Sequence, residues 1–334
     1  MVRYEEEDDE KEEKRSPLRL LVNKILLVFL VGLVATLALF AYEQYGKGTQ
    51  NLQIKSNNLG INIEENVTAP GEVTQFVPNM RFNHNTLSYY IDDTCPEEKR
   101  ARFYKALGII EKNTGIIIFS QVLQTENADI SVSCSKATLE TEKNVFVAGE
   151  GGPTKYLNLS LYPAILKGTV VLYEQSQCDY PITELHELLH VFGFSHINNR
   201  GLIMYPYVDC KQVIPEEIIR KLIQLYTIKP LAELYFINEN SSFVKFQNYL
   251  NFTVGIKNEG LLDADSVSLD ILNSDKDDKL IKSFNLEKIE FGSGQKFSVS
   301  YLKLPFSNEV NIKLVLKTNQ EEYNKENNIL EAGF

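Results

Sequence analysis

Three of the four histidines lie in one short segment, and their spacing constrains the backbone more than any other feature of the chain. His186, Glu187, His190, Gly193 and His196 give the pattern His-Glu-x-x-His-x-x-Gly-x-x-His. Residues four apart on an α-helix differ by about 40° around its axis, so His186 and His190 project from one face about one turn apart. We therefore predict a helix that ends at Gly193, where a positive φ returns His196 to the same point.

Imidazole nitrogens at this spacing can share one metal ion, and zinc accepts such ligands. Three neutral imidazoles leave a fourth position for water, which is the arrangement of a catalytic rather than a closed structural site. Glu187 points about 100° away from His186 around the helix, which suits an acceptor for a proton of the zinc-activated water. The sequence thus predicts peptide hydrolysis by one catalytic Zn²⁺ on His186, His190 and His196, with Glu187 as general base.

A second motif follows the third histidine. The segment Gly201-Leu202-Ile203-Met204-Tyr205-Pro206 places Met204 eight residues after His196. With the histidine pattern and Ala128-Asp129-Ile130, it resembles the metzincin zinc metallopeptidases, and among them the matrixins, the matrix-metalloproteinase-like branch. The resemblance covers approximately residues 81–229. It implies an α+β domain with a mixed sheet and long helices, endopeptidase activity, and Met204 as a hydrophobic floor under the zinc site and not a ligand.

The chain departs from the matrixin pattern at several points. Ile197 stands where matrixins usually have Ser, and residues 43–80 contain no cysteine that could hold the zinc in a latent state. His84 is the remaining histidine, so a second, structural zinc is not expected, and an ordinary polar or packed role is favoured for it. Calcium sites stay open, because single carbonyls and carboxylates leave little trace in a sequence.

An uncharged apolar run extends from Ile25 to Tyr42. With its apolar neighbours it approaches the roughly 20 residues that a bilayer requires, and its apolar residues cover every helix face, which disfavours a core helix. A cleaved signal peptide is the main alternative, but the long charged segment before the run favours a retained signal-anchor. More basic residues precede the run than follow it, which predicts a cytoplasmic N-terminus and an outer location for the rest.

This topology divides the chain into five segments. We expect a cytoplasmic acidic tail at 1–24, a transmembrane helix at 25–42, a stalk at 43–80, the peptidase domain at 81–229 and a β-sandwich at 230–334. The 45 acidic and 34 basic residues give a net charge of -11, which argues against nucleic acid as a partner. The expected partners are a protein or peptide substrate, the membrane through residues 25–42, and a surface partner of the sandwich.

Local patterns predict the elements of both outer domains. In the peptidase domain we expect a helix that begins at Pro96 and stops at Gly115, a strand at 169–173 before the histidines, and a loop at 148–153 that lines the substrate pocket. After Pro230, four alternating apolar runs predict an immunoglobulin-like sandwich. Lys257-Asn258-Glu259-Gly260 and Glu326-Asn327-Asn328 resemble the CARDB modules of prokaryotic surface proteins, which implies binding or spacing.

The four cysteines, Cys95, Cys134, Cys178 and Cys210, lie beyond the predicted membrane helix, where disulfides form. Two bridges are expected, and the sequence does not choose among three pairings. Zinc thiolates are the alternative, without a Cys-x-x-Cys spacing to support them. Glycosylation sequons that would face the same side begin at Asn66, Asn158, Asn240 and Asn251.

Two functions of different classes fit these features. The first is a membrane-anchored extracytoplasmic zinc endopeptidase. The second is a surface adhesion or peptide-binding protein whose metzincin-like domain is catalytically silent. Cleavage that disappears in Glu187→Ala distinguishes them, because that variant keeps the three ligands. A third interpretation, a cytoplasmic enzyme, requires the reverse membrane topology.

Overall fold

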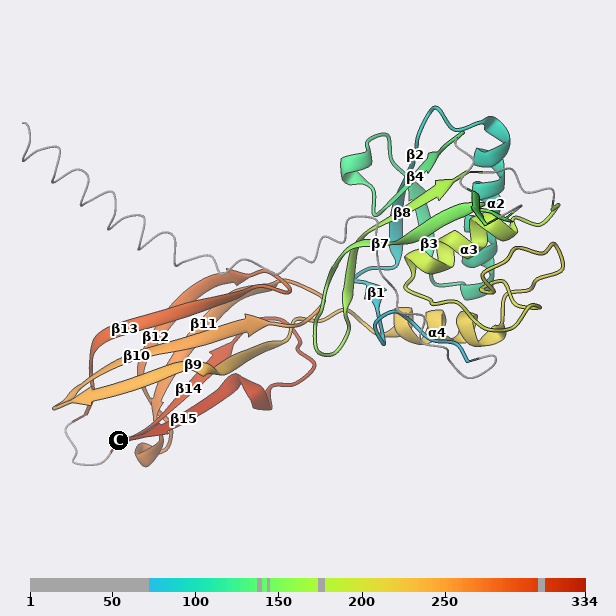
Figure 1. The fold of residues 1–334 in the computed structure, drawn as a ribbon. Helices are drawn as coiled ribbons and strands as arrows, with labels where there is room; N and C mark the ends of the chain where they lie inside the picture. Colours follow the sequence, from blue (N-terminus) through green and yellow to red (C-terminus); the bar gives the residue numbers. More distant parts are fainter. Residues whose placement is uncertain (1–71, 137–139, 143–144, 174–177, 306–309) are drawn as a thin grey trace, which may run out of the picture. The chain divides into compact units, whose positions relative to one another are not determined.

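The computed structural model describes residues 72–136, 140–142, 145–173, 178–305 and 310–334. The predicted tail at 1–24, the predicted membrane helix at 25–42 and most of the predicted stalk lie outside these ranges. None of the helices in the described part of the chain is long and apolar enough to cross a bilayer. The described elements form an α/β region, from β1 to α4, and a β region, from β9 to β15 (Figure 1).

The α/β region contains a six-stranded mixed sheet in the order β1-β8-β4-β2-β3, with β7 added to β8. Neighbours along this path are parallel, and β7 is antiparallel to β8. Three α-helices accompany the sheet, which confirms the predicted mixture of strands and helices. The elements are β1 (Arg81–Phe82), β2 (Thr86–Ile91), α2 (Glu97–Thr114), β3 (Ile118–Gln121), η1 (Thr125–Asn127), β4 (Ile130–Cys134), β5 (Glu140–Glu142), β6 (Val145–Phe146), β7 (Gly149–Leu157), β8 (Ala164–Leu172), α3 (Ile182–Val191) and α4 (Glu216–Thr227).

Helix α2 follows the predicted pattern. It begins after Pro96 and ends at Gly115, whose φ of 64° is left-handed. Phe103, Leu107 and Ile110 repeat along one face and are buried. Glycine adopts the left-handed conformation at little energetic cost, so Gly115 ends the helix without strain.

The loop predicted at 148–153 is wrong, because Gly149–Pro153 is the first half of strand β7 and pairs with β8. Glycine weakens strands, so a glycine-rich run favours a loop when it is judged by propensity alone. The packing supplies a different reason for these glycines. A Cβ on Gly149 would lie 2.7 Å from Cγ of Glu187, and one on Gly151 would overlap the Glu187 backbone. The missing side chains therefore allow α3 to lie directly against β7.

The β region consists of two antiparallel sheets. One has the order β13-β10-β9 and the other the order β12-β11-β14-β15. Apolar residues that alternate along β10, β11 and β14 meet in one core, as their spacing predicts. The elements are β9 (Leu234–Phe246), β10 (Tyr249–Asn258), β11 (Ala264–Asn273), η2 (Ser274–Lys276), β12 (Lys279–Ile289), β13 (Gly294–Lys303), β14 (Asn311–Lys317), η3 (Glu326–Asn328) and β15 (Ile329–Gly333).

All four cysteines are paired, as Cys95–Cys134 and Cys178–Cys210. This pairing resolves the three alternatives that the sequence left open and removes the zinc-thiolate alternative. Cys95–Cys134 joins the segment before α2 to the end of β4. Cys178–Cys210 joins the segment before α3 to the chain beyond Met204, so it closes a loop around the histidine motif.

Candidate functional site

Helix α3 presents two of the three clustered histidines. Its predicted core-facing residues, Leu185, Leu188, Leu189 and Phe192, are all buried. Gly193 then takes a φ of 86°, as predicted, and its N–H donates to the carbonyl of His190. A Cβ at Gly193 would also lie 2.8 Å from Sδ of Met80. Both the backbone angle and the space therefore favour glycine at the turn that brings His196 back.

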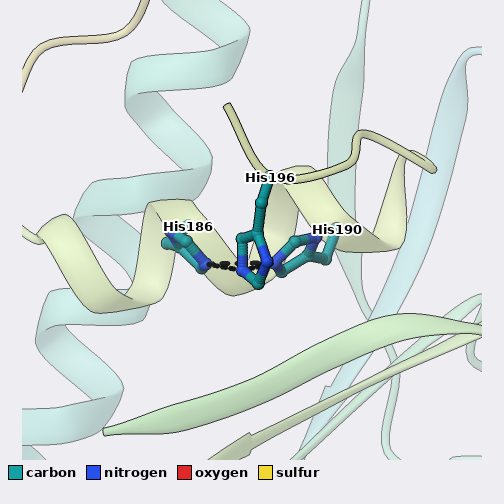
Figure 2. Close-up of side chains that lie close together, drawn as sticks. All are labelled: His186, His190 and His196. Carbon is teal, nitrogen blue, oxygen red and sulfur yellow. Dashed lines mark hydrogen bonds between the residues drawn. The ribbon is translucent and has the colours of Figure 1, made fainter. Parts of the chain in front are cut away.

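The three imidazoles converge through their Nε2 atoms (Figure 2). Nε2 of His190 lies 3.0 Å from that of His186 and 3.2 Å from that of His196, and the third separation is 3.3 Å. Zn–N bonds of about 2.0–2.1 Å at tetrahedral angles place ligand nitrogens roughly 3.3–3.4 Å apart. The spacing of the three nitrogens therefore fits a zinc ion.

The opposite ring nitrogens assign the tautomers. Nδ1 of His186 lies 2.6 Å from the carbonyl oxygen of Ile203, and Nδ1 of His190 lies 2.7 Å from that of Phe194. A carbonyl only accepts, so each Nδ1 carries the proton and each Nε2 carries a lone pair. Two lone pairs 3.0 Å apart cannot hydrogen-bond to each other. A cation between them satisfies both.

Burial keeps the imidazoles of His186 and His190 neutral. Desolvation, together with the smaller effect of the neighbouring His196, lowers the pKa of His186 to about 4. Desolvation also lowers the pKa of His190 well below its ordinary value. His196 is exposed, unlike the other two. His186 and His190 are thus ready to donate lone pairs at neutral pH, and His196 lies on the solvent side.

Glu187 lies on α3 between the two buried ligands and is itself buried against β7. Burial, together with the smaller effects of the charges of Glu150 and Glu184, raises the pKa of Glu187 to about 8. A nearby divalent cation favours the ionised carboxylate and opposes these effects. With metal present, Glu187 can therefore accept a proton near neutral pH.

The segment after the third histidine contacts the triad through its backbone. Met204 is fully buried, and its carbonyl accepts a hydrogen bond of 2.8 Å from the N–H of Ile197. The preceding residue, Ile203, provides the carbonyl that orients His186. The backbone around Met204 thus fixes one ligand ring, while the role of its side chain as a floor stays a prediction.

Two sets of contacts hold α3 in place, and neither is predicted by a local sequence pattern. Arg102 of α2 forms an ion pair with Glu184, with 2.8 Å between Nε and Oε1, and it donates to the carbonyls of Cys178 and Tyr180. Glu184 lies in the first turn of α3 and is buried. Arg102 therefore ties the start of the histidine helix to α2. Because the partners of Arg102 are 76 to 82 residues away in the chain, no local sequence pattern predicts these contacts.

The second support is an N-terminal strap, residues 72–77, which the sequence analysis placed in the stalk. The N–H of Phe76 donates to the carbonyl of Gly193 at 2.7 Å, and the N–H of Ser195 donates to the carbonyl of Thr74 at 2.9 Å. The Phe76 ring stacks on that of His190, with centroids 5.7 Å apart and planes 15° apart. The strap therefore contacts both the turn after α3 and one of its ligands.

Gln75 secures the strap to the end of α3. Its Nε2 donates to the carbonyls of Met80 at 2.8 Å and Phe192 at 3.0 Å. A single aromatic residue in a polar segment carries no periodicity, and the partner Phe192 is 117 residues away. Sequence reasoning missed the strap for these reasons.

His84 stays apart from the triad. Its Nε2 lies 3.0 Å from Asp129 and its Nδ1 lies 2.6 Å from Asn83, so it has an ordinary polar role. Over the described ranges, the triad is the one group of three or more His, Cys, Asp or Glu side chains placed to hold a metal. The calcium sites that the sequence left open stay a prediction.

Comparison with known proteins supports this site. A family model described as Matrixin matches residues 81–227. A search of curated proteins finds no match. Among solved structures, the C-terminal part resembles the CARDB domain of a Pyrococcus furiosus protein in complex with di-metal ions, at 13% identity over 31% of this chain and 86% of that chain, with a TM-score of 0.26. It also resembles a domain of a proposed cell surface protein from Methanosarcina acetivorans, at 17% identity over 31% and 90% of the two chains, with a TM-score of 0.24.

Proposed function

Because residues 81–227 are a matrixin domain with a zinc-binding histidine triad, the chain is a metalloendopeptidase of the matrixin family, and we propose that it works outside the cytoplasm on a membrane anchor. The observation that carries the peptidase assignment is the convergence of three Nε2 atoms at 3.0 to 3.3 Å. Histidines that serve only in ion pairs or in core packing have no reason to bring three Nε2 atoms this close together.

In the proposed reaction His186, His190 and His196 would hold Zn²⁺. When bound there, the ion would supply the Lewis acidity that activates water and polarises the scissile carbonyl. Glu187 accepts a proton from the attacking water and then delivers it to the leaving amine nitrogen. The Glu187 side chain packs against Gly149 and its backbone packs against Gly151, so the close approach of α3 to β7 helps to position this carboxylate.

Two features support the outer location. The uncharged run at 25–42 has the length and the flanking basic residues of a signal-anchor. The disulfides Cys95–Cys134 and Cys178–Cys210 pair every cysteine of the chain, and such bridges are rare in a reducing cytosol. A stalk at 43–80 that holds the peptidase near the membrane is part of the same proposal.

Cleavage of an unstructured protein by the detergent-solubilised full chain, with metal analysis of the same sample, tests the activity. Wild type and Glu187→Ala should both hold about one zinc per chain, and only wild type should cleave. Glu217→Ala, at an exposed carboxylate of α4, is the matched control and should cleave normally. Cleavage by Glu187→Ala at the wild-type rate would contradict the role of Glu187, and absence of zinc would contradict the triad assignment.

Two further results concern the alternative and the location. A full complement of zinc without cleavage of varied substrates would favour the adhesion or peptide-binding protein. Impermeant labels applied to intact cells should reach residues in 72–334. Labelling of the first 24 residues instead would reverse the topology.

A further inference from the structure

The three strands β13, β10 and β9 form one sheet (Figure 1), and several of its apolar side chains are exposed. Val244 is 62% exposed, Phe246 67%, Tyr249 40% and Tyr301 75%; we call these four residues the aromatic patch. Apolar side chains that cluster on a surface, unlike scattered ones, indicate a surface that interacts with another group.

Asn251 lies in the middle of the aromatic patch. It pairs with Val244 across β9, and Tyr249, two residues earlier on β10, lies on the same face and pairs with Phe246. Tyr301 lies beside Asn251 at the point where the register of β10 and β13 shifts. Its ring meets that of Tyr249 edge-on, with centroids 6.3 Å apart. Tyr249 and Tyr301 therefore flank the Asn251 side chain.

Asn251 is exposed and begins the sequon Asn251-Phe252-Thr253. Its Oδ1 accepts a hydrogen bond of 2.7 Å from the N–H of Tyr301. This bond uses the amide oxygen and fixes the plane of the amide, so Nδ2 is the atom left for a covalent bond to sugar. The sequon at Asn240 differs, because Asn240 is half-buried and its Cβ lies over Gly255.

We infer that Asn251 carries an N-linked glycan whose first sugar packs its C–H face on Tyr249 and Tyr301. In the transfer, Nδ2 of Asn251 bonds to C1 of the sugar, the bond from C1 to the phosphate oxygen of a lipid-linked oligosaccharide breaks, and the proton of Nδ2 leaves with the lipid phosphate. The glycan then covers the aromatic patch, because a pyranose offers an apolar face to an aromatic ring. The inference rests on the proposed outer location of residues 43–334.

Peptide mass spectrometry of the full chain, purified from the cells that make it, tests occupancy. The peptide with Asn251 should carry a mass of linked hexose or N-acetylhexosamine units, and the peptide with Asn240 should not. A bare Asn251 in a chain that surface labels reach would overturn the glycan and leave the proposed location intact. A bare Asn251 in a chain that surface labels do not reach would overturn both.

The contact with the tyrosines has its own test. Enzymatic removal of the glycan from the wild-type chain should lower the melting temperature of the β region by about 3 °C, a shift within the range for loss of one modest interaction. In Tyr249→Ser and Tyr301→Ser the same removal should lower it less, whereas in Tyr104→Ser, at an exposed tyrosine of α2, the wild-type shift should remain. Equal shifts in all four chains would overturn the packing of sugar on tyrosine.

Discussion

The α/β region and the β region both bury polar side chains, but for different purposes. In the β region, buried Asn258 accepts from the N–H groups of Glu233 and Gly260 and donates to the carbonyls of Leu262 and Ile289. All four bonds are made within the chain. In the α/β region, the Nε2 atoms of His186 and His190 face each other without a proton to share.

The difference separates a structural polar group from a functional one. Asn258 stabilises the fold because its bonds replace those it would make to water. The burial of His186, His190 and Glu187 costs stability, because these groups are desolvated and their proposed partners are a metal ion and a substrate. A buried polar group whose hydrogen bonds are all made within the chain therefore indicates architecture, and buried groups whose lone pairs converge on one point indicate chemistry.

Glu187→Gln should produce the largest effect, because it keeps the shape of the side chain and removes the proton acceptor. We expect kcat/KM to fall by roughly 10²–10⁴-fold. Zinc content, measured on the same samples, should not change. A loss of zinc together with activity would place Glu187 among the groups that hold the metal, which would alter the comparison with Asn258.

The same variant should stabilise the chelated chain at high pH. Burial raises the folded-state pKa of Glu187 to about 8 from 4.5, so the wild-type chain loses stability as pH rises through this window, where the unfolded state releases a proton that the folded state retains. Above pH 8 the free energy of unfolding of the variant should exceed that of wild type by up to roughly 5 kcal/mol, at 1.36 kcal/mol per pKa unit. Urea unfolding with chelator at pH 4 and pH 8 measures the difference. Equal gains at both pH values would show that charge is not its origin.

Asn258→Ala should destabilise the β region by about 2–4 kcal/mol, because it leaves buried N–H and C=O groups without partners. The shift should not depend on zinc or on pH between 5 and 8. Asn238→Ala, at an exposed position of β9, should stay within about 0.5 kcal/mol of wild type. Urea unfolding followed by a probe in the β region makes the measurement, and a zinc-dependent shift would break the contrast between the two regions.

Phe76→Ala should weaken zinc binding by about tenfold without removing a ligand, as the loss of outer contacts to ligating histidines commonly does. Competition with a chelator of known affinity gives the zinc dissociation constant directly. Phe243→Ala is the matched control, because Phe243 is also half-buried and stacks on Phe252 at 5.9 Å, but in the β region. Equal zinc affinity in wild type and both variants would show that Phe76 contributes to packing but not to zinc binding.

Sequence reasoning succeeded where information is local. The helix stop at Gly115, the burial of Leu185 and Leu188 and the positive φ of Gly193 all follow from spacing and residue type. It failed at Gly149–Pro153, where propensity indicates a loop and close packing on α3 requires glycine in a strand. The decisive contact in that case is with a helix that lies more than thirty residues later in the chain.

The sequence alone was enough to predict the chemistry of this protein, because the three histidines and the proposed proton acceptor lie on one helix and the turn after it, whose periodicity fixes their directions. Only the tertiary structure decided what orients them. The carbonyl of Ile203 sets the tautomer of His186, Arg102 holds the start of α3, and Phe76 stacks on His190. These contacts join residues far apart in the chain, and a pattern of neighbours cannot encode a distance that only folding creates.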